Sequence, residues 1–180
     1  MKPVLIAFLG LCLCLPLMAQ DNEKPLPKDF ESLKALAEKG DARAQNAVAV
    51  AYFNGEGVEK DLKEAAKWYR KAAEQGYAIS EQNLGLCYHR GEGVEKSPKE
   101  AVKWFRKAAD QGFAYSQAAL GVFYEKGQGV ERDYNEAIKW YRKAAEQGDA
   151  PAQSKLGYFY YAGLGVEKDG VEALKWVLLG

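Results

Sequence analysis

A repeating unit of 36 residues constrains the fold of this chain more than any other feature of the sequence. The segment Gly-x-Gly-Val-Glu begins at residue 55 and returns at 91, 127 and 163, and a tryptophan follows each copy at the same spacing. Self-similarity at a fixed period of 20–50 residues is typical of solenoid proteins. The period predicts a half-repeat helix at 30–40 and repeats at 41–76, 77–112, 113–148 and 149–180, after a lead-in at 20–29.

Each repeat is predicted to contain two helices. In the second helix of the first repeat, apolar residues recur at the spacing of one helical face. Asp61 and Glu64 form a capping-box pattern that predicts its start, with both side chains capping backbone donors reciprocally, and Gly76 predicts its end. The first helices carry Gly85, Gly121 or Gly157 where two helices are expected to approach closely. The sequence therefore predicts an all-α fold of tandem helix-turn-helix repeats. The apolar face comprises Ala65, Trp68, Tyr69, Ala72 and Ala73.

The first 19 residues differ from the repeats and are typical of a secretory signal peptide. Lys2 precedes an apolar run from Val4 to Ala19, and polar residues follow at once. A retained membrane anchor is the alternative, but the run is short for a membrane span and Pro16 interrupts it. Cleavage after Ala19 places the mature chain in the periplasm or outside the cell, with no membrane contact.

Charge and cysteine content exclude several classes of function. The chain has 25 basic and 25 acidic residues and a formal net charge of +0, so nothing favours nucleic acid as a partner. Two of the three cysteines lie in the signal segment. Cys87 is then the only cysteine of the mature chain, and no intramolecular disulfide can form. Its counterparts in the other repeats are apolar, which predicts a buried thiol.

The repeat resembles the Sel1-like repeat family, a relative of the tetratricopeptide repeats. This resemblance implies a right-handed α-solenoid superhelix that acts as an adaptor or scaffold in protein complexes. Bacterial members outside the cytoplasm are often linked to signalling regulation or host interaction. The matching residues of the second repeat are Leu84, Gly85, Tyr88, Gly91, Gly93, Val94, Ala101, Trp104, Lys107, Ala108, Ala109 and Gly112.

No combination of residues predicts catalysis, a metal site or a cofactor. His89 is the only histidine, and it lies two residues from Cys87, which places the two side chains on different sides of a helix. One cysteine and one histidine do not make a zinc site. The alternative is a β-lactamase-like, cell-wall-related hydrolase, through a cysteine-rich subgroup of the same family. That subgroup has a cysteine pair in each repeat, and this chain lacks such pairs.

Binding is therefore the predicted function, with a protein or peptide as the partner. In superhelices of this kind the first helices line the concave face, and outward positions that vary between repeats are free to bind. Packing against an adjacent helix is the alternative for each such residue, and a purely architectural spacer is the alternative for the chain. The predicted partner-binding residues are Phe53, Arg90, Tyr115, Tyr158 and Tyr161.

The last predicted helix has an unusual apolar end. Leu178 and Leu179 stand where the earlier repeats have arginine and lysine. Solenoid ends normally have a polar capping repeat. This pattern leads to two hypotheses: self-association through the C-terminal helix, or a chain that is cut short at Gly180.

Overall fold

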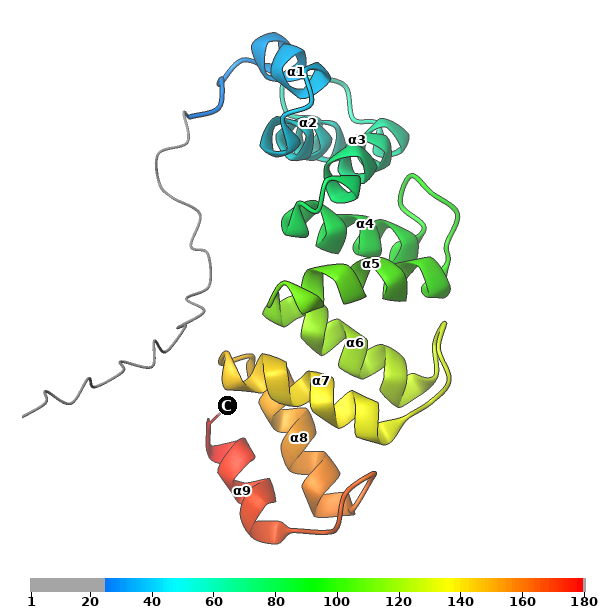
Figure 1. Ribbon diagram of the computed structural model, residues 1–180, viewed down its shortest axis with the longest axis vertical. Coiled ribbons are helices and arrows are strands. Elements are labelled where there is room, and N and C mark those ends of the chain that lie inside the picture. Colours follow the sequence, from blue (N-terminus) through cyan, green and yellow to red (C-terminus); the bar gives the residue numbers. More distant parts are fainter. Residues whose placement is uncertain (1–24, 180) are drawn as a thin grey trace, which may run out of the picture.

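The computed structural model describes residues 25–179, and the predicted signal peptide lies outside this range. The described residues form α-helices and no strands (Figure 1). The helices are α1 (Phe30–Glu38), α2 (Ala42–Asn54), α3 (Leu62–Glu74), α4 (Ala78–Arg90), α5 (Pro98–Asp110), α6 (Ala114–Lys126), α7 (Tyr134–Glu146), α8 (Ala150–Ala162) and α9 (Gly170–Leu179).

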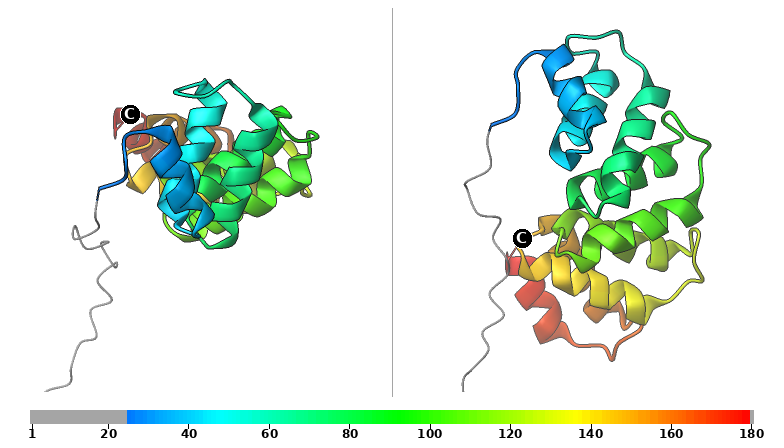
Figure 2. Two further views of the ribbon diagram at one scale, coloured as in Figure 1. Left: turned by 90° about the horizontal axis from the view of Figure 1, so that it is seen from above. Right: turned by 45° about the horizontal axis from the view of Figure 1, so that its top comes forward.

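Consecutive helices pack side by side along one axis, so the molecule is a curved stack rather than a globule (Figures 1 and 2). The main helix contacts join neighbours in the sequence, from α1 with α2 to α8 with α9. The loops from α4 to α5 and from α6 to α7 lie on the same edge of the stack (Figure 1). This arrangement confirms the predicted α-solenoid, in which each repeat is stabilised by the repeats beside it.

The start of α3 confirms the predicted aspartate cap, but the predicted reciprocal bond from the glutamate side chain is not formed. The Asp61 carboxylate accepts hydrogen bonds from the backbone N–H of Lys63 and Glu64, at 2.8 and 3.1 Å. The Glu64 side chain does not return to the Asp61 N–H and instead pairs with Lys67. The Asp61 N–H donates to the Tyr52 carbonyl at 2.9 Å, which closes the loop between α2 and α3. The Tyr52 carbonyl therefore accepts the hydrogen bond from the Asp61 N–H that the capping-box pattern assigned to the Glu64 side chain.

The second helices end as predicted. Gly76 has a φ of +83°, in the left-handed region that favours glycine. Its N–H donates to the Ala73 carbonyl and the Tyr77 N–H donates to the Ala72 carbonyl, which is the Schellman pattern. Gly112 and Gly148 repeat this geometry after α5 and α7. These glycines turn the chain from one repeat into the next.

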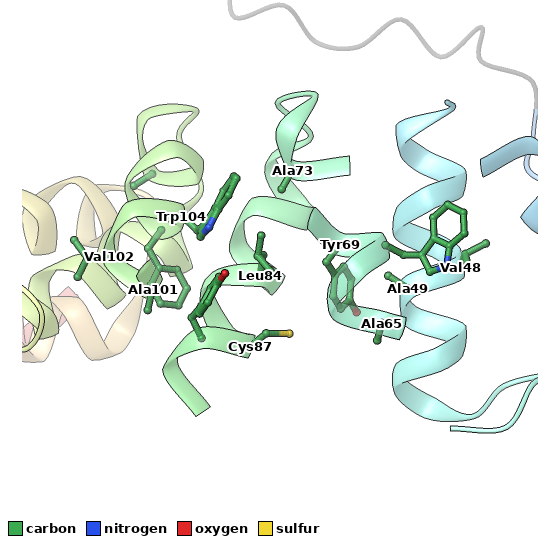
Figure 3. Close-up of a cluster of buried hydrophobic side chains, with 14 of the residues drawn as sticks. Val48, Ala49, Ala65, Tyr69, Ala73, Leu84, Cys87, Ala101, Val102 and Trp104 are labelled. Carbon is green, nitrogen blue, oxygen red and sulfur yellow. The ribbon is translucent and has the colours of Figure 1, made fainter. Parts of the chain in front are cut away.

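The predicted apolar face of α3 is buried, with Trp68 6% and Tyr69 5% exposed. Figure 3 shows Tyr69, Leu84 and Cys87 in one continuous core that spans adjacent repeats. The close approach predicted at the helical glycines is confirmed: a Cβ on Gly121 would lie 2.6 Å from the Tyr141 ring. Large aromatic rings of the second helices therefore fit directly against the backbone of the first helices.

Contacts between repeats follow the same 36-residue period. In α3, α5 and α7, an arginine guanidinium donates to a tyrosine hydroxyl of the following first helix, 18 residues later. The Gly-x-Gly-Val loop of each later repeat lies against the start of the preceding second helix, where a Cβ on Gly93 would be 1.8 Å from the Leu62 carbonyl oxygen. Within residues 25–179, every helix is too short or too polar to cross a membrane. The arginine–tyrosine pairs are Arg70–Tyr88, Arg106–Tyr124 and Arg142–Tyr160.

Candidate functional site

The structure distributes the five predicted binding residues over three separate places and does not bring them into one surface. Phe53 and Arg90 line one small cavity. Tyr115 lies on α6, away from both other groups, with its ring against Phe105. Tyr158 and Tyr161 line a groove between α8 and α9.

The cavity that contains Phe53 and Arg90 holds about 130 Å³. Phe53 is half-buried, and the Lys60 ammonium lies 5.7 Å from the centre of its ring. The Arg90 guanidinium is 3.8 Å from the Glu92 carboxylate. Because Phe53 packs between neighbouring repeats, it contributes mainly to stacking. The further lining residues of this cavity are Tyr69, Asn83, Leu86, Cys87 and Glu92.

Tyr115 is 49% exposed, and its ring centre lies 6.4 Å from that of Phe105. No cavity among the most prominent ones in the described chain includes it. Tyr115 is an exposed tyrosine outside the α8–α9 pair, which makes it a suitable control for the tyrosines of α8.

An apolar groove lies between α8 and α9. Its volume is about 490 Å³, and its exposed lining is almost entirely apolar. Tyr158 is 54% exposed and Tyr161 65% exposed. Gly157 is one of the lining residues, and a Cβ on it would lie 2.6 Å from Val177 Cγ2, so α9 packs closely against α8 at this point. The α8–α9 groove, as we call it below, is lined by Ser154, Gly157, Tyr158, Tyr161, Gly170, Ala173, Leu174 and Val177.

The other repeats contain the same face, but there it is covered. Leu174 of α9 is 63% exposed, whereas its counterparts Val102 and Ile138 are 7% and 5% exposed. Val177 is 54% exposed, whereas its counterpart Tyr141 is 1% exposed. In those repeats the following first helix packs against this face, as α8 packs on α7. The groove is therefore an exposed copy of a face that a following first helix covers in the earlier repeats.

Sequence reasoning missed Leu174 and Val177 as surface residues. Both occupy the apolar stripe of a second helix, and that stripe is core in every preceding repeat. Their exposure depends on the next helix in the stack, which the periodicity of a single helix does not describe. The one available signal was the apolar end of α9, where Leu178 is 82% and Leu179 60% exposed.

The two residues with nucleophilic or acid–base chemistry lie on different sides of α4, as predicted. Cys87 is 2% exposed and faces the cavity beside Tyr69. The His89 ring packs edge-on against Phe123 of α6, with 5.3 Å between ring centres. Burial lowers the pKa of His89, and the positive charges of Lys96, Arg90 and Lys126 lower it further. A thiolate–imidazole pair is therefore not formed.

Cys87 is expected to be chemically inert in the folded protein. Burial raises the pKa of its thiol to about 11, so little thiolate exists at neutral pH. In the chain from residue 20 onward, a disulfide reagent at pH 7.5 should label Cys87 about 100-fold more slowly than in denaturant. Equal rates in folded and unfolded protein would contradict the buried thiol.

Within the described range, no group of three or more histidine, cysteine or acidic side chains is arranged to hold a metal ion.

Comparison with known proteins gives consistent results. The protein-family model for the Sel1 repeat matches residues 42–77, 78–113, 114–149 and 150–179. Among solved structures, a protective antigen with an SLR fold from uropathogenic Escherichia coli strains is 44% identical, with a TM-score of 0.82. The alignment covers 85% of this chain and 33% of that antigen. No curated protein matches the sequence.

Two further structures extend the comparison. A Sel1 repeat protein from Oxalobacter formigenes is 41% identical with a TM-score of 0.79, covering 83% of this chain and 63% of that protein. The Helicobacter pylori cysteine rich protein B is 21% identical with a TM-score of 0.55, over 68% of this chain and 93% of that protein, and shares the fold alone. This chain thus spans a third and less than two thirds of the first two relatives. Because the family model accounts for nearly all of the described helices, the chain belongs to the Sel1 repeat family.

Proposed function

We propose that this chain is a non-catalytic scaffold that binds a protein or peptide partner, and that the α8–α9 groove is the principal binding surface. The observation that carries the proposal is the apolar groove with two half-exposed tyrosines on its wall. Contiguous apolar patches on soluble proteins mark interaction sites, and tyrosines are frequent anchors in them. Sel1 repeat proteins are usually protein-interaction scaffolds, which agrees with this assignment.

The chemistry of the partner follows from the way the other repeats fill the equivalent face. The following first helix packs there with aromatic side chains: the Phe123 ring of α6 lies 5.8 Å from that of Phe105, and the Phe159 ring of α8 lies 5.9 Å from that of Tyr141. Helix-in-groove recognition of this kind uses apolar residues three and four positions apart. The proposed partner is therefore an amphipathic helix with one apolar face. The nearby Leu178 and Leu179 extend the apolar surface, so a second copy of the chain is one possible source of such a helix.

The proposed location is the periplasm or the extracellular space. It is supported by Lys2 and the apolar run that follows it, which have the pattern of a cleaved signal peptide. N-terminal sequencing of the protein from the bacterial envelope should find Gln20 as the first residue. An intact Met1 in membrane fractions would favour the retained anchor instead.

The scaffold function is tested by affinity capture from an envelope extract of the source organism. The immobilised bait is the chain from residue 20 onward, compared with a Tyr158→Ala/Tyr161→Ala variant and with Tyr115→Ala as control. The double variant should keep the circular dichroism spectrum of the wild type. It should capture at least about tenfold less partner, because aromatic anchors contribute most to such interfaces. The control should capture as much as the wild type.

Each alternative outcome has a defined meaning. Equal capture by all three baits would place the binding surface away from the α8–α9 groove. The absence of any partner would contradict the scaffold function itself. Light scattering of the purified chain at high micromolar concentration separates self-association from capture of another protein, because only self-association raises the mass.

A further inference from the structure

The first helices carry a buried polar residue at one equivalent position. Gln45, Gln117 and Gln153 occupy it in α2, α6 and α8, and each is 4–6% exposed. In α4 the residue is Glu81, which is 3% exposed. A buried carboxyl in place of an amide is unusual, because an ionised side chain is costly to remove from water.

The glutamines join consecutive repeats by donating and accepting at the same time. Each side-chain amide donates to a backbone carbonyl eight residues earlier, in the last turn of the preceding second helix, at 3.1 Å in all three cases. Each of these carbonyls also accepts from the N–H of the glycine that follows its helix, at 3.0 Å, so the glutamine amide adds a second hydrogen bond at the helix end. The donor–acceptor pairs are Gln45 to Ala37, Gln117 to Ala109 and Gln153 to Ala145.

Two of these side chains also accept a hydrogen bond from the C-cap residue of the second helix of their own repeat. The Gln75 amide donates to the oxygen of Gln45 at 2.7 Å, and the Gln147 amide donates to Gln117 at 2.8 Å. In α4, where glutamate replaces glutamine, the Gln111 amide donates to one oxygen of Glu81 at 2.8 Å. Glu81 therefore keeps the accepting half of the pattern.

The donating half is missing when Glu81 is ionised. The equivalent carbonyl for α4 is that of Ala73, eight residues before Glu81. A carboxylate has no proton to donate, so an ionised Glu81 cannot make the hydrogen bond to Ala73 that the glutamines make at the equivalent junctions. A protonated carboxyl has one O–H and can donate to Ala73 as the glutamine amides do elsewhere.

We propose that Glu81 makes the packing of α4 on α3 more stable in acid than at neutral pH. Its protonated carboxyl donates a hydrogen bond to the Ala73 carbonyl, and ionisation of Glu81 removes this bond. Three copies of the same junction, each with glutamine, show the bonded geometry. The stack thus has one joint between its first and second repeats that responds to pH, while the equivalent joints with glutamine do not.

The electrostatic surroundings agree with this direction. Burial raises the pKa of the Glu81 carboxyl above its ordinary value of 4.5. The hydrogen bond from Gln111 and the charge of Lys107 lower this pKa, and the charge of Asp110 raises it. Lys107 and Asp110 both belong to α5. The net direction is upward, so the folded state holds the proton more tightly than the unfolded chain.

The sign of the pH dependence follows by linkage. Where the folded state binds more protons than the unfolded state, stability falls as pH rises. The contribution of Glu81 is fully present below the ordinary carboxyl pKa of 4.5 and is lost as pH rises through the raised folded-state pKa. At neutral pH the junction is therefore weaker than its three counterparts.

A Glu81→Gln variant tests the proposal, with the reciprocal Gln117→Glu variant as the matched control. Urea unfolding of the chain from residue 20 onward is followed at pH values from 4 to 8. At pH 7.5, Glu81→Gln should have an unfolding equilibrium constant about tenfold smaller than wild type, and this difference should vanish near pH 4. Gln117→Glu should lose stability at pH 7.5 and regain it in acid.

Hydrogen exchange locates the effect. In wild type, the amides of Gly76 and Tyr77 at the end of α3 should exchange more slowly at pH 4.5 than at pH 7.5, after correction for intrinsic rates. In Glu81→Gln, their protection should be the same at both pH values. The proposal is overturned if Glu81→Gln is no more stable than wild type at pH 7.5, or if its advantage does not change with pH.

Discussion

Replacing Gly93 with alanine is expected to cost about 3–5 kcal/mol of unfolding free energy. Gly93 has a φ of +72°, which costs an L-residue about 1–2 kcal/mol. The larger cost comes from space, because the new Cβ would lie 1.8 Å from the oxygen and 2.4 Å from the carbon of the Leu62 carbonyl. Both atoms are backbone, so the methyl group fits only if the second-repeat loop moves away from α3.

Gly57→Ala is the matched control, because Gly57 holds the same place in the first repeat and has the same φ of +72°. Its Cβ would meet only the Phe30 side chain, at 3.7 Å. This variant should lose only the backbone term of about 1–2 kcal/mol. Urea denaturation followed by circular dichroism at 222 nm measures both. Equal losses of unfolding free energy in the two variants would show that the contact between the second-repeat loop and α3 adds no cost to the substitution.

The helices could be predicted from the sequence because their signals are local. The aspartate before α3 and the glycine after it lie within a few residues of the helix they delimit, and predict bounds close to the observed Leu62–Glu74. Positive φ at the loop glycines was likewise predictable from residue type. The partner of the Asp61 N–H was not, because the Tyr52 carbonyl belongs to the preceding helix and only loop geometry brings it close.

The candidate site could be predicted only in part, because exposure in a solenoid depends on the neighbouring repeat. Tyr158 and Leu86 occupy equivalent positions, yet Tyr158 is 54% exposed and Leu86 is half-buried. The helical period assigns both to the same outward face. Leu86 lines a cavity with Phe53 and Tyr69 of the preceding repeat, whereas Tyr158 lines the α8–α9 groove. Aromatic character on that face therefore singled out Tyr158 and Tyr161 but could not separate them from Phe53.

The same dependence on neighbours predicts different unfolding behaviour for two equivalent core leucines. Leu120 in α6 and Leu156 in α8 are both 0% exposed. Truncating either to alanine should cost about 2–5 kcal/mol, from lost burial and the cavity that remains. The energetic loss is similar, but in a nearest-neighbour solenoid its structural consequence depends on the place of the repeat in the stack.

Leu156→Ala should weaken the α8–α9 pair, which is held to the rest of the described chain mainly through α7. We expect α8 and α9 to unfold first, in a separate step at low urea concentration. Leu120→Ala weakens α6, which has a repeat on each side, so the transition should stay single and move to lower urea concentration. Hydrogen exchange distinguishes the two: Leu156→Ala should lose protection in α8 and α9 alone, whereas Leu120→Ala should lose it throughout.

The volume-conserving Leu156→Met variant is the control, and it should cost less than about 1.5 kcal/mol while keeping a single transition. A single coincident transition in Leu156→Ala would mean that the interface between α7 and α8 is strong enough to make α8 and α9 unfold together with the rest of the described chain. The α8–α9 groove would then be as rigid as the centre of the stack. A separate early step would instead show that the groove belongs to the least stable part of the described chain. A bound helix covering Leu174 and Val177 would then be expected to raise the first transition selectively.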